Sequence, residues 1–178
     1  MDALENIHSR RSVRHFFNYP VPTDKVYAIL EAAHAAPSSG NLDSWEFLVV
    51  DDEKKILEIS SACNTQFWIS DAPMVIIVLS DTDRVKRIYG NRGEFYSIQN
   101  SSAAVQNLLL AANAVGLGAC WVGAFQEKEI KCALEIPDNR DVHAVIVVGD
   151  KAADPPKPKR KEVEYKCFFN KYGKRKTD

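Results

Sequence analysis

The run Met74-Val75-Ile76-Ile77-Val78-Leu79 is the strongest indicator of the architecture, because six apolar residues follow one another without a polar break. A strand with one face in water alternates apolar and polar residues, whereas a strand covered on both faces does not. The run from Val142 to Gly149 has the same character. We therefore predict two fully buried strands, each covered by packed structure on both faces.

The longest predicted helix extends from about Glu94 to Val115 and ends at Gly116 and Gly118. Apolar residues surround it almost completely, so it must be buried. Its outer polar residues are uncharged amides, which a helix shared between two subunits tolerates. These amides are Gln99, Asn100, Gln106 and Asn107.

Shorter elements complete the prediction. Helices are expected from Asp2 to about Arg10, from Thr23 or Asp24 to before Pro37, from Glu53 to Ala62 and from Glu127 to Leu134, with a helical turn from Gln66 to Asp71 and strands at 45–50 and 120–123. In the first helix, Leu4 and Ile7 are expected to face inward. The charged segment 81–93 is expected to be an exposed excursion. Three or four strands among five or six helices predict one α+β or α/β domain over residues 1–178.

The end of the chain combines prolines with aromatic residues. Pro155, Pro156 and Pro158 exclude regular structure there. The aromatic residues that follow are too apolar to remain in water, which favours a homodimer. They are Tyr165, Phe168, Phe169 and Tyr172.

Composition narrows the range of partners. The chain has 178 residues, 46% of them hydrophobic, a net charge of -1 and a pI near 6.4. This near-neutral charge removes the long-range attraction to nucleic acid or to an anionic membrane. No apolar run approaches the roughly 20 residues of a membrane helix, and Met1–Glu5 lacks the features of a signal peptide. A cytoplasmic protein with small-molecule or protein partners is the expectation.

Several chemistries lack their usual signatures. The four cysteines form no C-x-x-C pair, so neither a zinc site nor a redox dithiol is indicated, and we expect reduced, mostly buried thiols. The sequence contains no H-E-x-x-H, G-x-S-x-G or P-loop motif, and the four histidines are scattered. Gly116-Leu117-Gly118 lacks the third glycine of a dinucleotide-binding fold and follows a helix.

Two basic clusters remain, near opposite ends of the chain. The first is Arg10-Arg11-Ser12-Val13-Arg14, and the second contains Lys157, Lys159, Arg160 and Lys161. Guanidinium groups bind phosphate or carboxylate oxygens in a bidentate manner, so converging clusters indicate an anion site. Taken separately, each cluster also fits a solvated charged turn or tail.

Other segments suit the remainder of an anionic, planar ligand. The loop Pro37-Ser38-Ser39-Gly40-Asn41 offers hydroxyl and amide groups, although loops of this composition commonly bind nothing. The strand end at Gly123-Ala124-Phe125 has no bulky polar side chain, and glycine lets a ligand approach the backbone. Flavin mononucleotide (FMN) needs cations for its phosphate, polar partners for its ribityl chain and apolar walls for its ring.

These residues resemble the FMN-dependent nitroreductases over nearly the whole chain. The resemblance rests on segments in the same order and at similar spacing: Arg10-Arg11-Ser12-Val13-Arg14, Ala35-Ala36-Pro37-Ser38-Ser39-Gly40-Asn41 with Trp45, Asp71-Ala72-Pro73, Gln106-Asn107-Leu108 with Gly116-Leu117-Gly118, and Trp121-Val122-Gly123-Ala124-Phe125. It implies a three-layer α/β/α sandwich with a mixed, largely antiparallel sheet. It also implies an intertwined homodimer with FMN at the interface.

The resemblance assigns residue roles. Arg10 and Ser12 would meet the phosphate, beside Arg11, and Arg14 would lie near the N1–O2 edge of the ring. Pro37, Ser38, Ser39 and Asn41 would come from the other subunit. Main-chain N–H groups of Val122, Gly123 and Ala124 would face atom N5 of the flavin ring. The side chains of Lys159, Arg160 and Lys161 would complete the set of cations around the phosphate. Gln66 would contact the ring. Asp43 and Ser44 depart from the family pattern, which has glutamine and proline there.

The implied activity is ping-pong hydride transfer. NAD(P)H, a transient co-substrate, would reduce the bound FMN, and a nitroaromatic, quinone or similar small-molecule acceptor would reoxidise it, with no catalytic side chain required and no metal. An FMN-binding carrier or sensor on the same dimer is the alternative. A third possibility, docking of the basic clusters on an acidic partner or nucleic acid, fits the near-neutral charge poorly.

Overall fold

The computed structural model describes residues 2–175. Its sheet contains β1 (Phe16–Phe17), β2 (Trp45–Val50), β3 (Met74–Ser80), β4 (Gly118–Val122) and β5 (Asp141–Lys151). All the pairs between these strands are antiparallel, and β5 lies between β3 and β4 while β2 forms an edge beside β3. One parallel bridge joins Ser12 to Ala119 at the outer edge of β4. The predicted α+β fold with a largely antiparallel sheet is confirmed.

The two central strands are buried on both faces, as the apolar runs predicted. Every residue of β3 is buried. Val75 and Ile77 pack into the core on one face of the sheet, whereas Ile76 and Val78 pack into a second core on the opposite face. Side chains of a strand alternate between the faces, so an unbroken apolar run supplies both cores at once.

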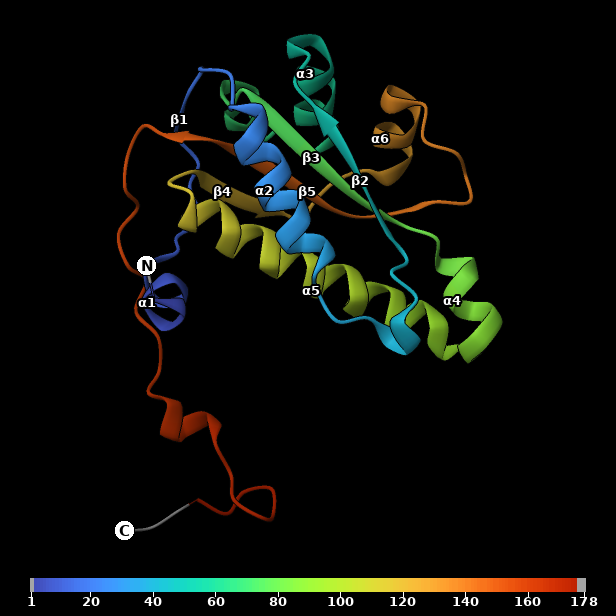
Figure 1. Ribbon diagram of the computed structural model, residues 1–178, viewed down its shortest axis with the longest axis vertical. Coiled ribbons are helices and arrows are strands. Elements are labelled where there is room, and N and C mark those ends of the chain that lie inside the picture. Colours follow the sequence, from blue (N-terminus) through green and yellow to red (C-terminus); the bar gives the residue numbers. More distant parts are fainter. Residues whose placement is uncertain (1, 176–178) are drawn as a thin grey trace.

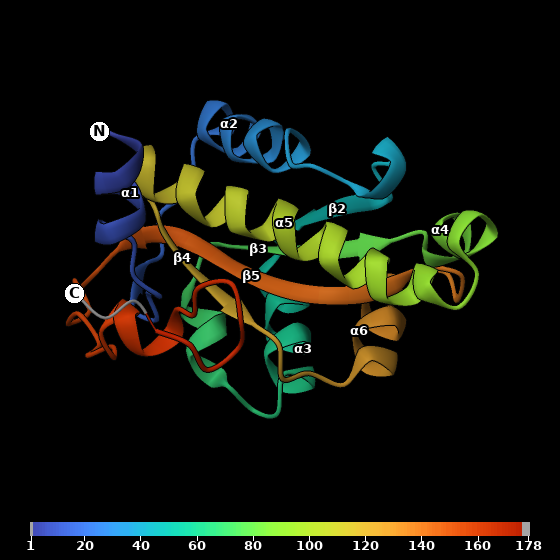
Figure 2. The same ribbon diagram turned by 90° about the horizontal axis from the view of Figure 1, so that it is seen from below.

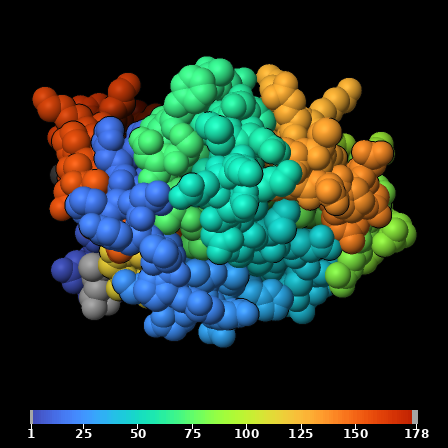
Figure 3. All heavy atoms as spheres, turned by 90° about the horizontal axis from the view of Figure 1, so that it is seen from above, coloured from blue at the N-terminus to red at the C-terminus, as the bar shows by residue number. Residues whose placement is uncertain are grey.

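Helices cover both faces (Figure 2). On one face lie α2 (Thr23–His34) and α5 (Arg92–Ala114), and on the other α3 (Glu53–Ala62), α6 (Glu127–Leu134) and the short 3-10 helix η2 (Phe67–Asp71). The space-filling view shows α3 and α6 beside each other on the second face (Figure 3). The arrangement is a three-layer α/β/α sandwich.

Two short helices lie at opposite ends of α5 (Figure 1). Helix α1 (Ala3–Ser9) packs near the C-terminal end, where the side-chain amide of Asn6 donates to the carbonyl of Leu110 at 3.0 Å. Helix α4 (Thr82–Tyr89) packs near the N-terminal end. The 3-10 helices η1 (Ser39–Asn41) and η3 (Val163–Lys166) complete the described elements.

Two local predictions were wrong, and one short strand had no prediction. Segment 81–93 was expected to be an exposed excursion but contains α4, which packs on the body because the Asp81 side chain caps its N-terminus and Val85 is buried. Leu4 and Ile7 do not face inward and are 64% and 50% exposed in the single chain. Phe16 and Phe17 form β1, paired with the end of β5.

The cysteines and the chain end agree in part with expectation. All four cysteines are free, but only Cys63 and Cys120 are buried. Burial raises the pKa of the Cys63 thiol to about 11, so it stays neutral at pH 7. After β5 the chain leaves the body (Figure 1), and the aromatic residues of the tail remain substantially exposed. Within residues 2–175, every helix is too short or too polar to cross a bilayer.

Candidate functional site

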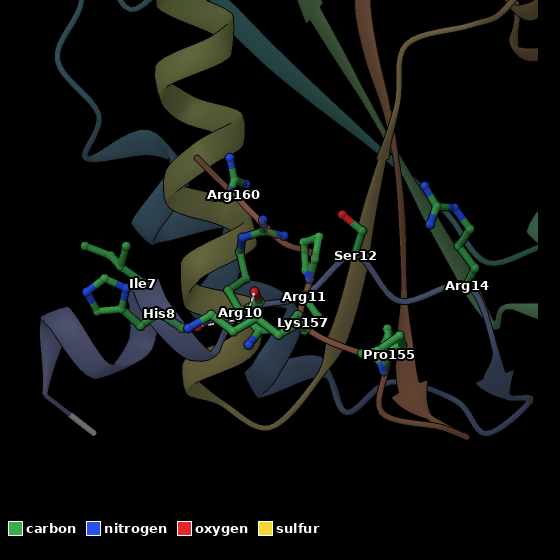
Figure 4. A pocket seen from close by; sticks show the side chains of 11 residues that line it. Ile7, His8, Arg10, Arg11, Ser12, Arg14, Pro155, Lys157 and Arg160 are labelled. Atoms are coloured by element: carbon green, nitrogen blue, oxygen red, sulfur yellow. Dashed lines mark hydrogen bonds between the residues drawn. The ribbon is translucent and has the colours of Figure 1, made fainter. Parts of the chain in front are cut away.

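The two basic clusters meet at one cavity of about 460 Å³, which we call the basic cavity (Figure 4). The segment leaving α1 forms one wall, and the proline-rich segment after β5 forms the other. The lining residues are Ile7, His8, Arg10, Arg11, Ser12, Arg14, Pro155, Pro156, Lys157, Pro158 and Arg160. Segments separated by most of the chain therefore place cations around a single space.

Backbone contacts fix the first wall. Helix α1 ends at Ser9, and the chain then runs beside β4, where the Val13 N–H donates to the Ala119 carbonyl at 3.1 Å. The Val13 side chain is buried in the core at 2% exposure. A Cβ on Gly118 would lie 3.0 Å from the Val13 side chain, so glycine permits this close approach. The segment that carries Ser12 is consequently attached to the sheet.

The three arginines of this segment differ in their surroundings. Arg11 Nη1 donates to the carbonyls of His8 and Arg10, both at 2.7 Å, so this guanidinium neutralises the C-terminal carbonyls of α1. The Arg14 guanidinium lies 5.8 Å from the centre of the Trp68 ring, a cation–π distance. Figure 4 shows Arg14 set apart from the other cations.

Within residues 2–175, no acidic side chain neutralises the cations of the basic cavity. No Asp or Glu of this described part of the chain lines the cavity. Among the ion pairs found within residues 2–175, none involves Arg10, Arg14, Lys157 or Arg160. Clustered like charges repel unless an anion joins them, so the site favours a phosphate or carboxylate ligand.

The second basic cluster contributes unequally. Lys157 and Arg160 line the basic cavity, whereas Lys159 does not. Lys161 instead borders a separate hollow with Arg160, Glu162 and Tyr165. The structure thus brings Arg160 to the first cluster and adds Lys157, which was not among the expected phosphate contacts.

The strand end after β4 is open, as a ring site would require. Val122 is buried, while Gly123 and Ala124 are exposed. Apart from Gly123 and its two chain neighbours, no atom of the described residues lies within 4 Å of the position that a Cβ on Gly123 would occupy. Gln66 Nε2 donates to the Ala124 carbonyl at 3.4 Å and to the Cys63 carbonyl at 2.9 Å, so Gln66 adjoins this strand end.

Cys120 lies beneath the arginines and is 1% exposed. Burial raises the pKa of its thiol, although Arg14, Arg10 and a hydrogen bond with Ser12 oppose the shift. A neutral buried thiol is a poor nucleophile, so Cys120 acts as a packing residue. No group of His, Cys, Asp or Glu side chains in the described part of the chain could hold a metal ion.

The loop Pro37–Asn41 is not part of the basic cavity. Its Ser39 is bonded to Asn100 in α5, whereas α1 is bonded to the same helix at Leu110 and Asn113. A rise of 1.5 Å per residue separates Asn100 from Asn113 by about 20 Å along the helix. Pro37, Ser38, Ser39 and Asn41 therefore lie far from Arg10 within one chain, and their role in binding stays a prediction.

Comparison with known proteins gives consistent matches. The model of the nitroreductase family matches residues 7–70 and 57–150. A protein of Archaeoglobus fulgidus, provisionally named NADH dehydrogenase/NAD(P)H nitroreductase, is 33% identical over 152 residues, which are 83% of this chain and 84% of that protein.

Solved structures agree with these matches. A crystal structure from Bacteroides thetaiotaomicron with the same provisional name has a TM-score of 0.84 at 34% identity, covering 96% of this chain and 98% of the other. An FMN-dependent nitroreductase from Clostridium difficile has a TM-score of 0.81 at 28% identity, covering 95% and 99%. The family model, the sequence identity and the fold agree, and this chain therefore belongs to the nitroreductase family of oxidoreductases.

Proposed function

We propose that this protein binds FMN and uses it to transfer hydride from NAD(P)H to nitroaromatic, quinone or similar acceptors. The basic cavity is the observation that carries the proposal, because its cations have no acidic partners among the described residues. The printed names of the relatives, which mention FMN and NAD(P)H, support the same assignment.

The described residues suit both the phosphate end and the ring end of FMN. A phosphate dianion matches Arg10, Lys157 and Arg160, which form no ion pair within residues 2–175. The open backbone at Gly123 gives a planar ring access to main-chain N–H groups, since no side chain fills the space beside it. Gln66 lies at the same strand end.

The protein's contribution is to bind and orient. Bound FMN would supply the two-electron chemistry between hydride donor and acceptor. Arg10, Ser12, Lys157 and Arg160 would hold the phosphate. Gly123 and Ala124 would offer N–H groups to the ring, and Arg14 would place positive charge beside it. Preorganised charges of this kind stabilise charge that develops during a reaction, without side-chain rearrangement.

We further propose a homodimer in which each copy completes the other's site. The loop Pro37–Asn41 and the basic cavity lie at opposite ends of α5, so one chain cannot bring them to a single FMN. Large apolar side chains are exposed on α1, α5 and the tail, including Leu4 at 64% and Phe95 at 52%. Exposed apolar surface of this extent favours burial against a second copy.

The first experiment is an absorption spectrum of the purified protein with anaerobic titration by NADH and by NADPH. We expect a flavin spectrum that bleaches with at least one donor and recovers with a quinone. A protein without flavin that also fails to take up added FMN would contradict the proposal. Flavin that resists both donors would favour the carrier or sensor alternative.

The second experiment tests the phosphate contacts. Arg10→Ala and Arg160→Ala should each weaken FMN binding tenfold or more, since a hydrogen bond to a charged group contributes about 1.5–3 kcal/mol. Lys54→Ala, at an exposed position on α3, makes the same charge change away from the cavity and is the control. Equal affinities for all three variants would exclude the basic cavity as the phosphate site.

A mixed dimer tests the shared site. A copy with Ser39→Ala paired with a copy carrying Arg10→Ala regenerates one intact site only if these residues act across the interface. We expect about half of the sites in such mixed dimers to regain the original affinity. Two defective sites would show that both residues act within one chain.

A further inference from the structure

Asn100 is the one buried amide among the described polar residues of the core, at 4% exposure. It lies on α5, and the hydrogen bonds of its side chain all reach the segment before β2. Its Oδ1 accepts from the Ser39 N–H at 2.9 Å, and its Nδ2 donates to the Ser39 and Ser44 hydroxyl oxygens at 3.0 and 3.4 Å. A backbone N–H can only donate, so the orientation of this amide is fixed.

These bonds determine the direction of the Ser39 hydroxyl group. Its oxygen must act as the acceptor, because an amide NH₂ has no acceptor capacity. The hydroxyl proton is therefore not used in the contact with Asn100. Ser39 is half-buried, so this proton can be donated to a group outside the chain.

Ser38 is arranged in the opposite way. Its hydroxyl donates to Asp43 Oδ1 at 2.9 Å and accepts from the Asp43 N–H at 3.1 Å. A carboxylate only accepts, so the Ser38 proton is committed to Asp43. Of the two neighbouring serines, only Ser39 retains a proton for a ligand.

The loop backbone requires support from these side chains. Gly40, Asn41 and Asp43 have φ values of 58°, 53° and 45°, in the left-handed region. Non-glycine residues there cost of order 1 kcal/mol each. A Cβ on Gly40 would lie 2.6 Å from the Tyr89 hydroxyl, so α4 also packs closely against the loop.

We infer that Asn100 is a positioning residue that directs the Ser39 hydroxyl proton toward an anionic or carbonyl oxygen of the flavin, while Asp43 withdraws Ser38 from that role. The inference rests on the proposed function, since it names which loop residue meets the cofactor. It assigns a role to Asp43, which stands where the family usually has glutamine. It also distinguishes Ser39 from Ser38, although both were expected to belong to the FMN site.

The test measures FMN release from the purified protein by the rise in flavin fluorescence on dilution. Ser39→Ala should raise the dissociation constant roughly tenfold, and Ser38→Ala by less than twofold. Asn100→Asp keeps the acceptor for the Ser39 N–H but loses the donor, so the Ser39 hydroxyl turns toward the new carboxylate. We expect Asn100→Asp to weaken FMN binding as much as Ser39→Ala does. The double variant that carries both substitutions should lose no more FMN affinity than either single variant.

The outcomes separate this inference from the proposed function. If the unmodified protein binds FMN but Ser38→Ala weakens binding as much as Ser39→Ala, the assignment is wrong. Additive losses in the double variant would likewise show that Asn100 does not act through Ser39. If Asn100→Asp fails to fold, judged by circular dichroism, the Ser39→Ala and Ser38→Ala pair still decides. Failure of the unmodified protein to bind FMN would refute the proposed function itself.

Discussion

The two halves of α5 are buried by different kinds of side chain. The C-terminal half is apolar, with Ala104, Val105, Leu108, Leu109 and Ala112 in the core. The N-terminal half buries polar residues instead. Of the seven buried polar residues in the described chain, six lie at this end: Ser44, Ser80, Thr82, Ser97, Asn100 and Ser101.

Because of this difference, the C-terminal half of α5 contributes mainly to the stability of the fold, and the N-terminal half positions polar groups. Apolar burial is non-directional, so the C-terminal half fixes the helix on the sheet without specifying the orientation of any polar group. Hydrogen bonds are directional, and those of Asn100 set the geometry of the loop that precedes β2. Substitutions in the two halves should therefore affect different properties.

The largest expected effect is on stability, from Leu108→Ala in the apolar half. Leu108 is fully buried, and truncation of such a leucine costs about 2–5 kcal/mol through lost transfer energy and a residual cavity. Urea unfolding should show this loss, while the FMN affinity of the folded fraction changes little. A loss of unfolding free energy below about 1 kcal/mol would mean that the side chains around position 108 move to fill the cavity left by the substitution.

Four polar side chains form a network at the other end of the helix. Ser80 Oγ contacts Thr82 Oγ1 at 2.9 Å, Ser97 Oγ at 2.7 Å and His143 Nε2 at 2.7 Å, and Thr82 contacts Ser97 at 3.0 Å. Three hydroxyl protons cannot supply four bonds. Full pairing therefore requires a proton on His143 Nε2, and leaves Nδ1 as the nitrogen that titrates.

The second prediction concerns the pH dependence of stability. Burial lowers the pKa of His143, against opposing raising effects of Asp141 and Glu127. As pH falls below the unfolded histidine pKa of about 6.5, the unfolded chain takes up a proton more readily than the folded one, so stability falls. His143→Gln should reduce this slope between pH 7 and pH 5. An unchanged slope would assign the dependence to another histidine.

The central strands and the family motifs were predictable because each depends on local pattern. Successive apolar residues in 74–79 can be accommodated only by a strand with two covered faces. The Arg10–Arg14 cluster and the Gly123 strand end are contiguous motifs, so their order in the chain was sufficient to indicate the family.

The polar half of α5 was not predicted, because Asn100 was expected on the outer face. Uncharged amides occur on exposed and buried faces alike, and only tertiary packing separates them. A signal was present nonetheless: Ser97, Asn100, Ser101 and Ala104 follow the i, i+3, i+4, i+7 spacing of a single helix face. That spacing continues into Leu108, which indicates one buried stripe that changes from polar to apolar.

The contribution of each cation could not be obtained from sequence. Lys157 lines the basic cavity and Lys159 does not, although both lie in the same proline-rich segment. Side-chain direction along an extended segment depends on where the tail crosses the body. Arg11 likewise turns back to the carbonyls of α1, a choice between neighbouring arginines that three-dimensional contacts determine.

The smallest expected effect has the opposite sign. Ser101 is fully buried, and its hydroxyl has no hydrogen-bond partner within the described residues. An unpaired buried hydroxyl costs about 1–3 kcal/mol, partly offset by the small void that its removal leaves, so Ser101→Ala should stabilise the protein by about 1 kcal/mol or less. Ser97→Ala, one turn earlier, breaks two hydroxyl contacts and should destabilise it. Paired urea unfolding curves distinguish the two serines. If Ser101→Ala destabilises as much as Ser97→Ala, the Ser101 hydroxyl belongs to the network, and the whole polar half of α5 acts as one hydrogen-bonded unit.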